Sequence, residues 1–312
     1  MNLSDLAGPA LSVFSRRFLL VTLVPVCAGA LYLLCLVWAG APQGGVSFSR
    51  AWAKATGLGG AEIALLLLVV LVAAFLTQSS LPALHRLWQG SWPMPFRGRR
   101  LTRHRRARAR LERRSALPAD LASRPAAERA ALLHSAYRAA RQLDLAYPRQ
   151  DPDVRPTALG NALAALYGAA GAGYGWDAAA AWPRLYPVLP DRARLLADDA
   201  RDALDQAVTL AGVGLVAACA GLPLLVPAGW WVLLTLLPAA LGALAYRSAV
   251  HSVPVYRAAV QTAFDLHRFD LLRALHLPLP ADADAERVLA EGLCRSWNRA
   301  ARFPTAYRHD GP

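Results

Sequence analysis

The sequence predicts an all-α membrane protein with four transmembrane helices in two pairs and a helical cytoplasmic module. The 312-residue chain is 55% hydrophobic and only 18% charged, below the roughly 25% charged residues of typical soluble domains. Its apolar residues gather in four stretches whose cores contain no ionised side chain, and with their flanks each reaches about 20 residues, enough to cross a bilayer as a helix. These stretches are residues 18–39, 63–76, 208–226 and 229–246.

The boundaries of the predicted segments follow from these stretches and from the polar sequence between them. No segment alternates polar and apolar residues as a half-buried strand would, so we expect every element to be helical. The prediction comprises a cytoplasmic N-terminus at 1–17, spans at 18–39, 61–82, 206–226 and 229–249, an extracytoplasmic loop at 40–60, a cytoplasmic region at 83–205 and a cytoplasmic tail at 250–312.

An arginine-rich segment follows the second apolar stretch and sets the expected orientation. Between His85 and Ser115 there are eleven arginines and one acidic residue, and this segment accounts for most of the net charge of +13. Basic residues close to a span stay on the cytoplasmic side. Arg16 and Arg17 before the first stretch and Arg247 after the fourth agree, so both termini are predicted to be cytoplasmic and the protein to lie in a bacterial plasma membrane.

The first apolar stretch also has an alternative interpretation as an export signal. Residues 15–20 resemble a twin-arginine signal, but no residue separates the arginine pair from Phe18. The apolar run of about 22 residues is also longer than the 7–15 of a signal peptide. We therefore expect an uncleaved membrane anchor.

The cytoplasmic regions show helical spacing interrupted by proline and glycine. In the first predicted helix, Leu133, Tyr137, Ala140 and Leu143 are expected to share one face. The glycine-rich stretch at 168–175 lacks the Gly-Lys-Ser/Thr ending of a phosphate loop, so it is expected to be a flexible hinge. The predicted cytoplasmic helices are 126–147, 157–167, 191–205, 258–277 and 283–301.

No catalytic residue, cofactor site or metal site is predicted, and we expect that the protein is not an enzyme. Four carboxylates cluster before the third stretch, and two of them at i and i+4 could face one cation. A solvated face, or pairing with Arg194, Arg201 or the arginine-rich segment, is the favoured interpretation. The seven histidines are scattered and are expected to be surface polar residues. The clustered carboxylates are Asp198, Asp199, Asp202 and Asp205.

Ten arginines form the candidate binding site of the chain. Their position beside a span favours two roles, a determinant of topology and a site for anionic membrane lipid, which is worth about 1 kcal/mol per arginine near the surface. Nucleic acid is a less favoured partner, because no aromatic residues interleave the arginines for base stacking. The candidate lipid-binding residues are Arg97, Arg99, Arg100, Arg103, Arg105, Arg106, Arg108, Arg110, Arg113 and Arg114.

Two cytoplasmic sequences carry a resemblance to other proteins. RPTALGNALAALYGAAGAGYGWDAAAAWPRLYPVLP (155–190) and AFDLHRFDLLRALHLPLP (263–280) resemble recurring segments of uncharacterised multi-pass membrane proteins of high-GC actinobacteria. No activity is assigned to such proteins, so the resemblance implies a location and no functional residue. The layout of two span pairs around a helical piece is similar to that of bestrophin-type anion channels, an analogy of layout alone. The polar and aromatic pattern expected after the second span of such a channel is replaced here by the arginine run.

Two functional hypotheses follow. The first is a non-enzymatic scaffold, held close to anionic lipid, that presents its cytoplasmic module to a protein partner or to copies of itself. The second is an oligomeric ion channel, since Pro25, Pro223 and Pro238 can kink the spans. A pump or coupled transporter is disfavoured, because the spans have no ionisable residue in their cores.

Overall fold

The structure is a computed structural model that describes residues 17–91 and 96–298. It is all-helical, with 84% of residues in helices and no strand among the described residues, which confirms the predicted all-α class. The chain divides into two compact units. Unit 1 comprises residues 1–87 and 201–251, and unit 2 comprises residues 88–200 and 252–312.

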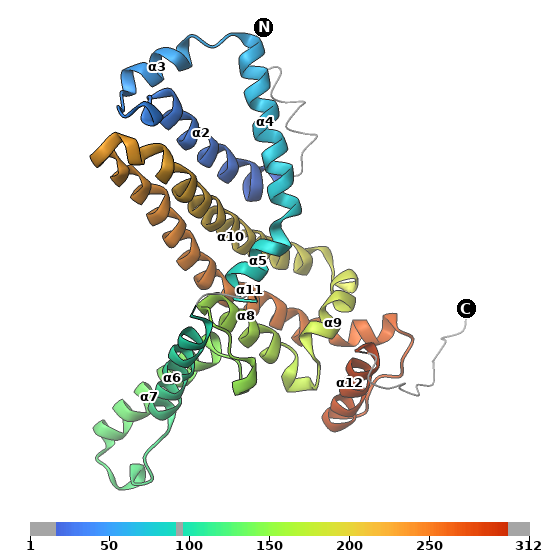
Figure 1. Cartoon of the computed structure of the whole chain (residues 1–312). Helices are drawn as coiled ribbons and strands as arrows, with labels where there is room; N and C mark the ends of the chain where they lie inside the picture. The colour runs from blue at the N-terminus through green and yellow to red at the C-terminus, as the bar shows by residue number, and fades with distance from the viewer. Residues whose placement is uncertain (1–16, 92–95, 299–312) are drawn as a thin grey trace. The chain divides into compact units, whose positions relative to one another are not determined.

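Unit 1 contains the apolar helices (Figure 1). Ser47 caps α3 with its side-chain oxygen, and this short helix lies in the stretch predicted as a loop. The elements of unit 1 are the π-helical turn η1 (Phe18–Leu23), α2 (Val24–Trp38), η2 (Ala41–Gln43), α3 (Phe48–Thr56), α4 (Gly60–Ser79), α5 (Leu81–Trp88), the second part of α10 (Asp191–Leu225), η7 (Val226–Thr235) and the first part of α11 (Leu236–Ala274).

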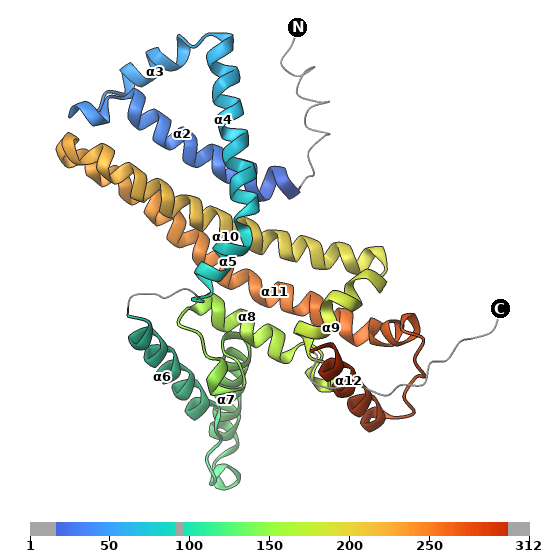
Figure 2. The same cartoon turned by 45° about the vertical axis from the view of Figure 1, so that its right-hand side comes forward.

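Within the described residues, three helical segments are long and apolar enough to cross a membrane: Phe18–Gln43, Gly60–Ser79 and Asp191–Ala274. The prediction of four separate spans is therefore met only in part, because the third segment contains both the third and the fourth apolar stretch. Within it the chain reverses at Gly229, whose φ of 64° and ψ of −122° are not helical. In unit 1, the adjoining parts of α10 and α11 consequently run side by side in opposite directions (Figures 1 and 2).

Small residues allow α10 and α11 to approach closely within unit 1. A Cβ atom added at Gly214 would lie 2.8 Å from the Cα of Gly242 and 2.8 Å from the carbonyl oxygen of Pro238. Small residues at helix interfaces are typical of membrane proteins, where van der Waals packing and not the hydrophobic effect drives association.

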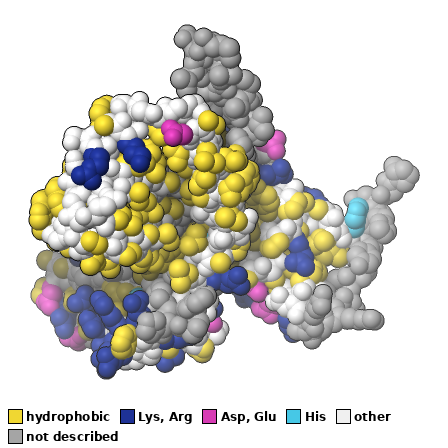
Figure 3. Space-filling view, turned by 45° about the horizontal axis from the view of Figure 1, so that its top comes forward, with side chains coloured by type: hydrophobic (Ala, Val, Ile, Leu, Met, Phe, Trp, Pro, Cys, Tyr) yellow, Lys and Arg dark blue, Asp and Glu magenta, His cyan; other side chains and the backbone are white. Residues whose placement is uncertain are grey.

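Helix α4 packs far less than its neighbours. Ala74 is its one buried residue, and Leu65, Leu67 and Leu68 are each more than half exposed. Figure 3 shows hydrophobic side chains gathered over a wide surface that carries few charges. A helix with apolar residues all round and so little burial is suited to a lipid environment.

Unit 2 has a conventional buried core built around α8. Leu159, Leu163 and Leu166 of this helix are buried, as are Trp176 and Phe264 from other segments. Its elements are α6 (Arg97–Ser115), η3 (Leu121–Ser123), α7 (Ala126–Ala146), η4 (Asp151–Asp153), α8 (Ala158–Ala169), η5 (Ala172–Tyr174), α9 (Ala178–Leu185), η6 (Tyr186–Val188), the remaining parts of α10 and α11, and α12 (Ala283–Trp297).

Most of the helices predicted for the cytoplasmic regions are present among the described residues, although the apolar face named for the first of them is not the buried one. Helix α7 buries Ala136 and Ala139, whereas Leu133 and Tyr137 of the predicted face are exposed, Tyr137 by 66%. The glycine-rich stretch contains a 3-10 turn, η5, directly after α8. Gly171 precedes this turn with a φ of 74°, a left-handed conformation that favours glycine.

Candidate anion-binding helix and charged junction

The arginine-rich segment folds as a helix, α6, that pairs with α7 in unit 2. Among the partly buried residues of α6, four recur at alternating spacings of three and four: Leu101, His104, Arg108 and Leu111. This spacing keeps residues on one side of a helix and is the pattern of coiled-coil seams. It identifies the side of α6 that packs against α7.

Helix α7 offers a matching seam. Leu132 and Leu143 are partly buried, and Ala136 and Ala139 between them are buried. The two alanines let the α6 backbone come close, which explains why the structure selects this face of α7 over the bulkier face that we predicted. The two helices thus form a hairpin that leaves one whole side of α6 uncovered.

The uncovered side of α6 carries a regular row of arginines. We call Arg99, Arg103, Arg106, Arg110 and Arg113 the arginine stripe; all five are exposed. At about 100° per residue, their spacings of four and three place them opposite the seam, along about 21 Å of helix. Figure 3 shows basic side chains gathered at the lower left, where Figure 1 draws α6.

Two of the ten candidate arginines are held by the protein itself. The Nε of Arg105 lies 3.0 Å from a carboxylate oxygen of Asp151. Arg108 pairs with Glu112 at 2.9 Å and donates to the carbonyl oxygen of Arg149 at 2.7 Å. Their guanidinium groups brace α6 against the segment that follows α7, so these two belong to the fold more than to a binding surface.

The other eight form no ion pair with an acidic side chain of the described residues. The guanidinium carbon of Arg99 lies over the ring of Phe96, 5.4 Å from its centroid. Between residues 97 and 146 the sequence has fourteen arginines and four acidic residues, so the hairpin has too few internal anions to neutralise its charge. The eight are Arg97, Arg99, Arg100, Arg103, Arg106, Arg110, Arg113 and Arg114.

His104 shows how the arginines act on their own helix. Its Nδ1 lies 3.2 Å from the hydroxyl oxygen of Tyr147. Partial burial lowers the pKa of His104, and the charges of Arg103 and Arg100 lower it further. Burial also raises the pKa of Tyr147, so this contact at the seam is between two neutral groups near pH 7.

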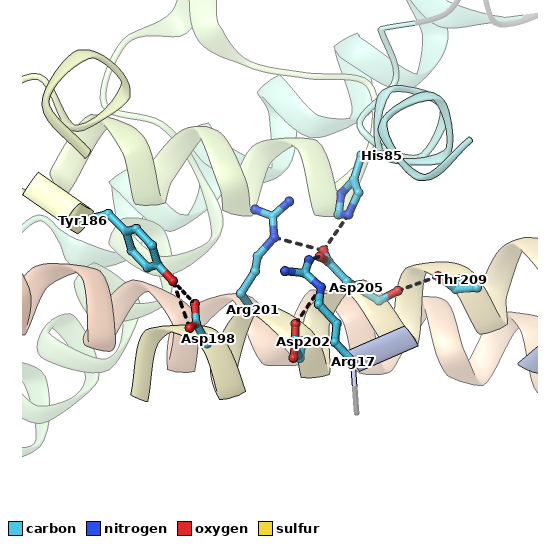
Figure 4. A network of polar contacts seen from close by, with 8 residues as sticks. All are labelled: Arg17, His85, Tyr186, Asp198, Arg201, Asp202, Asp205 and Thr209. Atoms are coloured by element: carbon cyan, nitrogen blue, oxygen red, sulfur yellow. Dashed lines mark hydrogen bonds and ion pairs between the residues drawn. The ribbon is translucent and has the colours of Figure 1, made fainter. Parts of the chain in front are cut away.

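A second charged cluster, which we call the junction, lies in unit 1 and has the opposite character (Figure 4). Asp205 of α10 is buried, with its side chain 1% exposed. One of its carboxylate oxygens lies 2.7 Å from an Nη of Arg17, and the other lies 2.8 Å from Nε2 of His85 and 3.0 Å from Nε of Arg201. Arg17 also pairs with Asp202 at 3.1 Å.

The junction ties together three parts of the chain that are distant in sequence. Arg17 precedes η1, His85 lies on α5, and Arg201 and Asp205 lie on α10. The hydroxyl of Thr209 donates to the backbone carbonyl of Asp205 at 2.8 Å, one turn further along. A buried carboxylate with this many donors is a structural anchor, since losing its partners would leave an uncompensated charge.

The acidic cluster of the sequence therefore divides among different partners. The predicted pairing with Arg201 is confirmed for Asp205. In unit 2, the hydroxyl of Tyr186 donates to Asp198 at 2.7 Å (Figure 4), and Asp199 is exposed. No group of three or more histidine, cysteine or acidic residues among the described residues is arranged to hold a metal ion.

His85 is the residue of the junction that sequence analysis misinterpreted. We expected the histidines to be surface residues, yet His85 is 7% exposed. Its position one turn after the predicted second span (61–82), beside apolar Leu84 and Leu87, was the available signal. Its partner is 120 positions away, and no local pattern reveals a contact of that separation.

The sequence matches no protein-family model, and comparison with curated proteins and with solved structures gives no match. The resemblance to actinobacterial membrane proteins and the likeness of layout to bestrophins therefore stay predictions.

Proposed function

We propose that this chain is a non-enzymatic integral membrane protein that holds a cytoplasmic helical module against the anionic surface of a bacterial plasma membrane. The arginine stripe is the observation that carries the proposal. Five cations lie in one row on the free side of a helix, and the described residues supply no acidic partner for them. Phosphate groups of anionic lipids are the counterions that such a row fits, at about 1 kcal/mol per arginine.

The short connection between α5 and α6 favours lipid over other anions as the partner of the arginine stripe. Helix α5 follows α4 almost directly and ends at Trp88, and α6 begins at Arg97. The nine peptide units between them span at most about 32 Å when fully extended. If α4 crosses the membrane, α6 starts close to a membrane surface by chain length alone.

The proposed topology has four crossings. The α10–η7–α11 segment would enter and leave the membrane as a hairpin, with its reversal at Gly229 on the outer side and Arg247 on the inner side. Together with crossings by α2 and α4, this arrangement puts both termini and the arginine stripe in the cytoplasm, as the distribution of basic residues favours.

Peptide-resolved hydrogen exchange of the full-length protein in nanodiscs tests the lipid contact. Bound lipid should slow amide exchange across α6 at least tenfold in discs containing phosphatidylglycerol, compared with discs of phosphatidylcholine alone. Replacing Arg103, Arg106 and Arg110 by glutamine should abolish this difference, because three lost contacts cost about 3 kcal/mol.

A matched control removes three arginines from the other helix of the hairpin. Arg129, Arg138 and Arg141 of α7 are exposed, and their replacement by glutamine changes the net charge equally. This variant should keep the protection of α6. Equal loss of α6 protection in both variants would show that the net charge of the protein, and not the position of the arginines on the stripe, determines lipid binding. Protection by added duplex DNA in phosphatidylcholine discs, with none from phosphatidylglycerol, would favour nucleic acid instead.

An oligomeric ion channel is the second candidate, favoured by the exposure of α4. This helix buries only Ala74, so its surface is available to other copies of the chain as well as to lipid. Planar-bilayer recording of purified protein tests this function. Absence of current across a range of ions, voltages and lipids would remove it.

A further inference from the structure

A short helix crosses one end of the apolar helices of unit 1. Helix α3 lies between α2 and α4 in the chain and bridges their ends in space (Figures 1 and 2). The backbone N–H of Ser47 donates to the carbonyl oxygen of Ala39 at 2.9 Å, which holds the start of α3 beside the end of α2. Only three residues separate Thr56, the last residue of α3, from α4. Helix α3 therefore lies at the end of α2 and α4 that is opposite to the junction.

Helix α3 has an aromatic side and a basic side. Phe48 and Trp52 are four positions apart, so they share one side, and they are 59% and 73% exposed. At about 100° per residue, Arg50 and Lys54 lie on the opposite side, and both are exposed. Neither forms an ion pair with an acidic side chain of the described residues. Ala51, between the two sides, is the one buried residue of α3, which packs against α2.

More aromatic side chains lie next to α3 within unit 1. The rings of Phe48 and Trp231 meet edge to face, with their centroids 5.8 Å apart. Trp231 in turn stacks on Trp230 at 4.0 Å between centroids, and Trp230 is 68% exposed. Both tryptophans directly follow Gly229, where the chain reverses between α10 and α11. Exposed aromatic rings thus gather at the same end of the apolar helices as α3.

This distribution of side chains is typical of a helix that lies in a membrane surface. Such a helix places Trp, Phe or Leu in the boundary between headgroups and acyl chains and carries Lys or Arg on its other side. Tryptophan is enriched at this depth because its ring is apolar while its N–H seeks a polar partner. The exposed apolar surface of α4 begins a few residues after α3, so lipid that surrounds α4 would reach α3 as well.

The size of the aromatic surface argues against a protein as its partner. A specific protein interface buries about 800 Å² on each side. Complete burial of three aromatic side chains covers about 450–750 Å². Phe48, Trp52 and Trp230 offer less than this, because part of each ring is already covered within unit 1. A lipid surface has no such minimum area.

We propose that α3 lies along the leaflet farther from the junction, with Phe48 and Trp52 inserted at the headgroup end of the acyl chains and with Arg50 and Lys54 turned toward the phosphates. The inference rests on the membrane location of the apolar helices but not on the arginine stripe. Because insertion of the aromatic rings does not depend on lipid charge, this contact forms on phosphatidylcholine as well as on anionic lipid.

Fluorine NMR of the full-length protein labelled with 5-fluorotryptophan, in nanodiscs of phosphatidylcholine, tests this depth. The signal of Trp52 is the one that is absent from the spectrum of Trp52→Phe. A nitroxide attached near the headgroup end of the acyl chain should broaden this signal at least threefold more than a water-soluble gadolinium chelate does. Trp176, which is buried in unit 2, serves as the control and should be broadened by neither reagent.

A matched pair of variants tests the contribution of the inserted ring. Trp52→Gln removes the ring, whereas Ala53→Gln places the same new side chain at the adjacent exposed position. In phosphatidylcholine discs, Trp52→Gln should speed amide exchange of residues 48–56 at least fivefold, and Ala53→Gln less than twofold. Neither substitution should alter exchange in α6.

Three results would overturn the proposal. Broadening of Trp52 by the gadolinium chelate that equals or exceeds the effect of the nitroxide would place its ring in water. Broadening by neither reagent would show that a protein surface, such as a second copy, covers the ring. Equal exchange rates in the two variants would show that the ring does not hold α3 in place. Slow exchange in α4 together with any of these results would contradict the placement of α3 alone, whereas rapid exchange in α4 would contradict the membrane location itself.

Discussion

The junction and the arginine stripe use the same side chain for opposite purposes. At the junction, Arg17 and Arg201 surround the buried carboxylate of Asp205, and every charge has a partner inside the protein. On α6, exposed arginines such as Arg106 form no ion pair with the described residues. Arginines whose charge is neutralised internally hold the fold together, whereas we propose that the row on α6, which has no acidic partner among the described residues, binds an external anion.

The largest loss of stability is expected when the buried carboxylate of the junction is removed. Asp205→Asn removes the charge of the buried carboxylate that Arg17, His85 and Arg201 share, so these side chains lose their common acidic partner. Breaking a buried ion pair in this way costs about 3–5 kcal/mol. Thermal unfolding in detergent should show a large fall in Tm. Asp199→Asn, at an exposed position on the same helix, should change Tm little; equal falls in both variants would contradict the role of the junction.

A smaller loss is expected when one cation of the junction is removed. Arg17→Gln leaves Asp205 with His85 and Arg201, so part of the network remains. Arg17 is 51% exposed, and solvent screening limits its contribution, so we expect destabilisation of about 1–2 kcal/mol. The midpoint of chemical unfolding measures it, and an unchanged midpoint would show that Arg17 does not anchor the start of η1.

The seam between α6 and α7 should be weakly pH-dependent through His104. Its folded pKa is lowered by burial and by neighbouring arginines, so the unfolded chain binds the proton more readily. Stability is therefore complete above about pH 6.5, the pKa of an unperturbed histidine, and falls as pH drops through the lowered folded value.

This dependence is measured by unfolding wild type and His104→Gln at pH 7.5 and pH 5.5. The variant should lose less stability on acidification than the wild type does. His134→Gln, on the exposed side of α7, serves as the control and should behave as the wild type. A larger acid loss in His104→Gln than in wild type would reverse the expected sign.

Substitutions in the arginine stripe are expected to change the stability least. Replacing Arg103, Arg106 and Arg110 by glutamine should shift the unfolding free energy in detergent by less than about 0.5 kcal/mol per residue, because exposed side chains without partners contribute little to folding. Thermal unfolding checks this. A loss comparable with that of Asp205→Asn would mean that the stripe is structural.

Local patterns in the sequence predicted helices well and long-range partners poorly. Helix α7 begins at Ala126, as predicted, and Thr157 caps α8 by accepting from the backbone N–H of Gly160 at 3.1 Å. The pair of Arg201 and Asp205 is separated by a single helical turn and was foreseen. The contacts of Asp205 with Arg17 and His85 join distant segments, and sequence spacing does not encode them.

The wrong face of α7 has a similar cause. Leu133 and Tyr137 are more hydrophobic than Ala136 and Ala139, so periodicity alone selected the former. The approach of α6 favours the smaller side chains, and that preference appears only once the partner helix is known. All five arginines of the stripe were among the candidate lipid-binding residues, but no helix was predicted over residues 97–115, so their arrangement in one row was not predicted.

Salt dependence of the α6 exchange rates tests the central claim most directly. In phosphatidylglycerol nanodiscs, raising the salt from 50 mM to 500 mM shortens the Debye length to about 4 Å and screens contacts between exposed arginines and phosphates. We predict that wild-type α6 loses its lipid-dependent protection over this range while the helices of unit 1 keep theirs. Protection of α6 that depends neither on salt nor on lipid charge would contradict the claim that its arginines bind an anionic membrane.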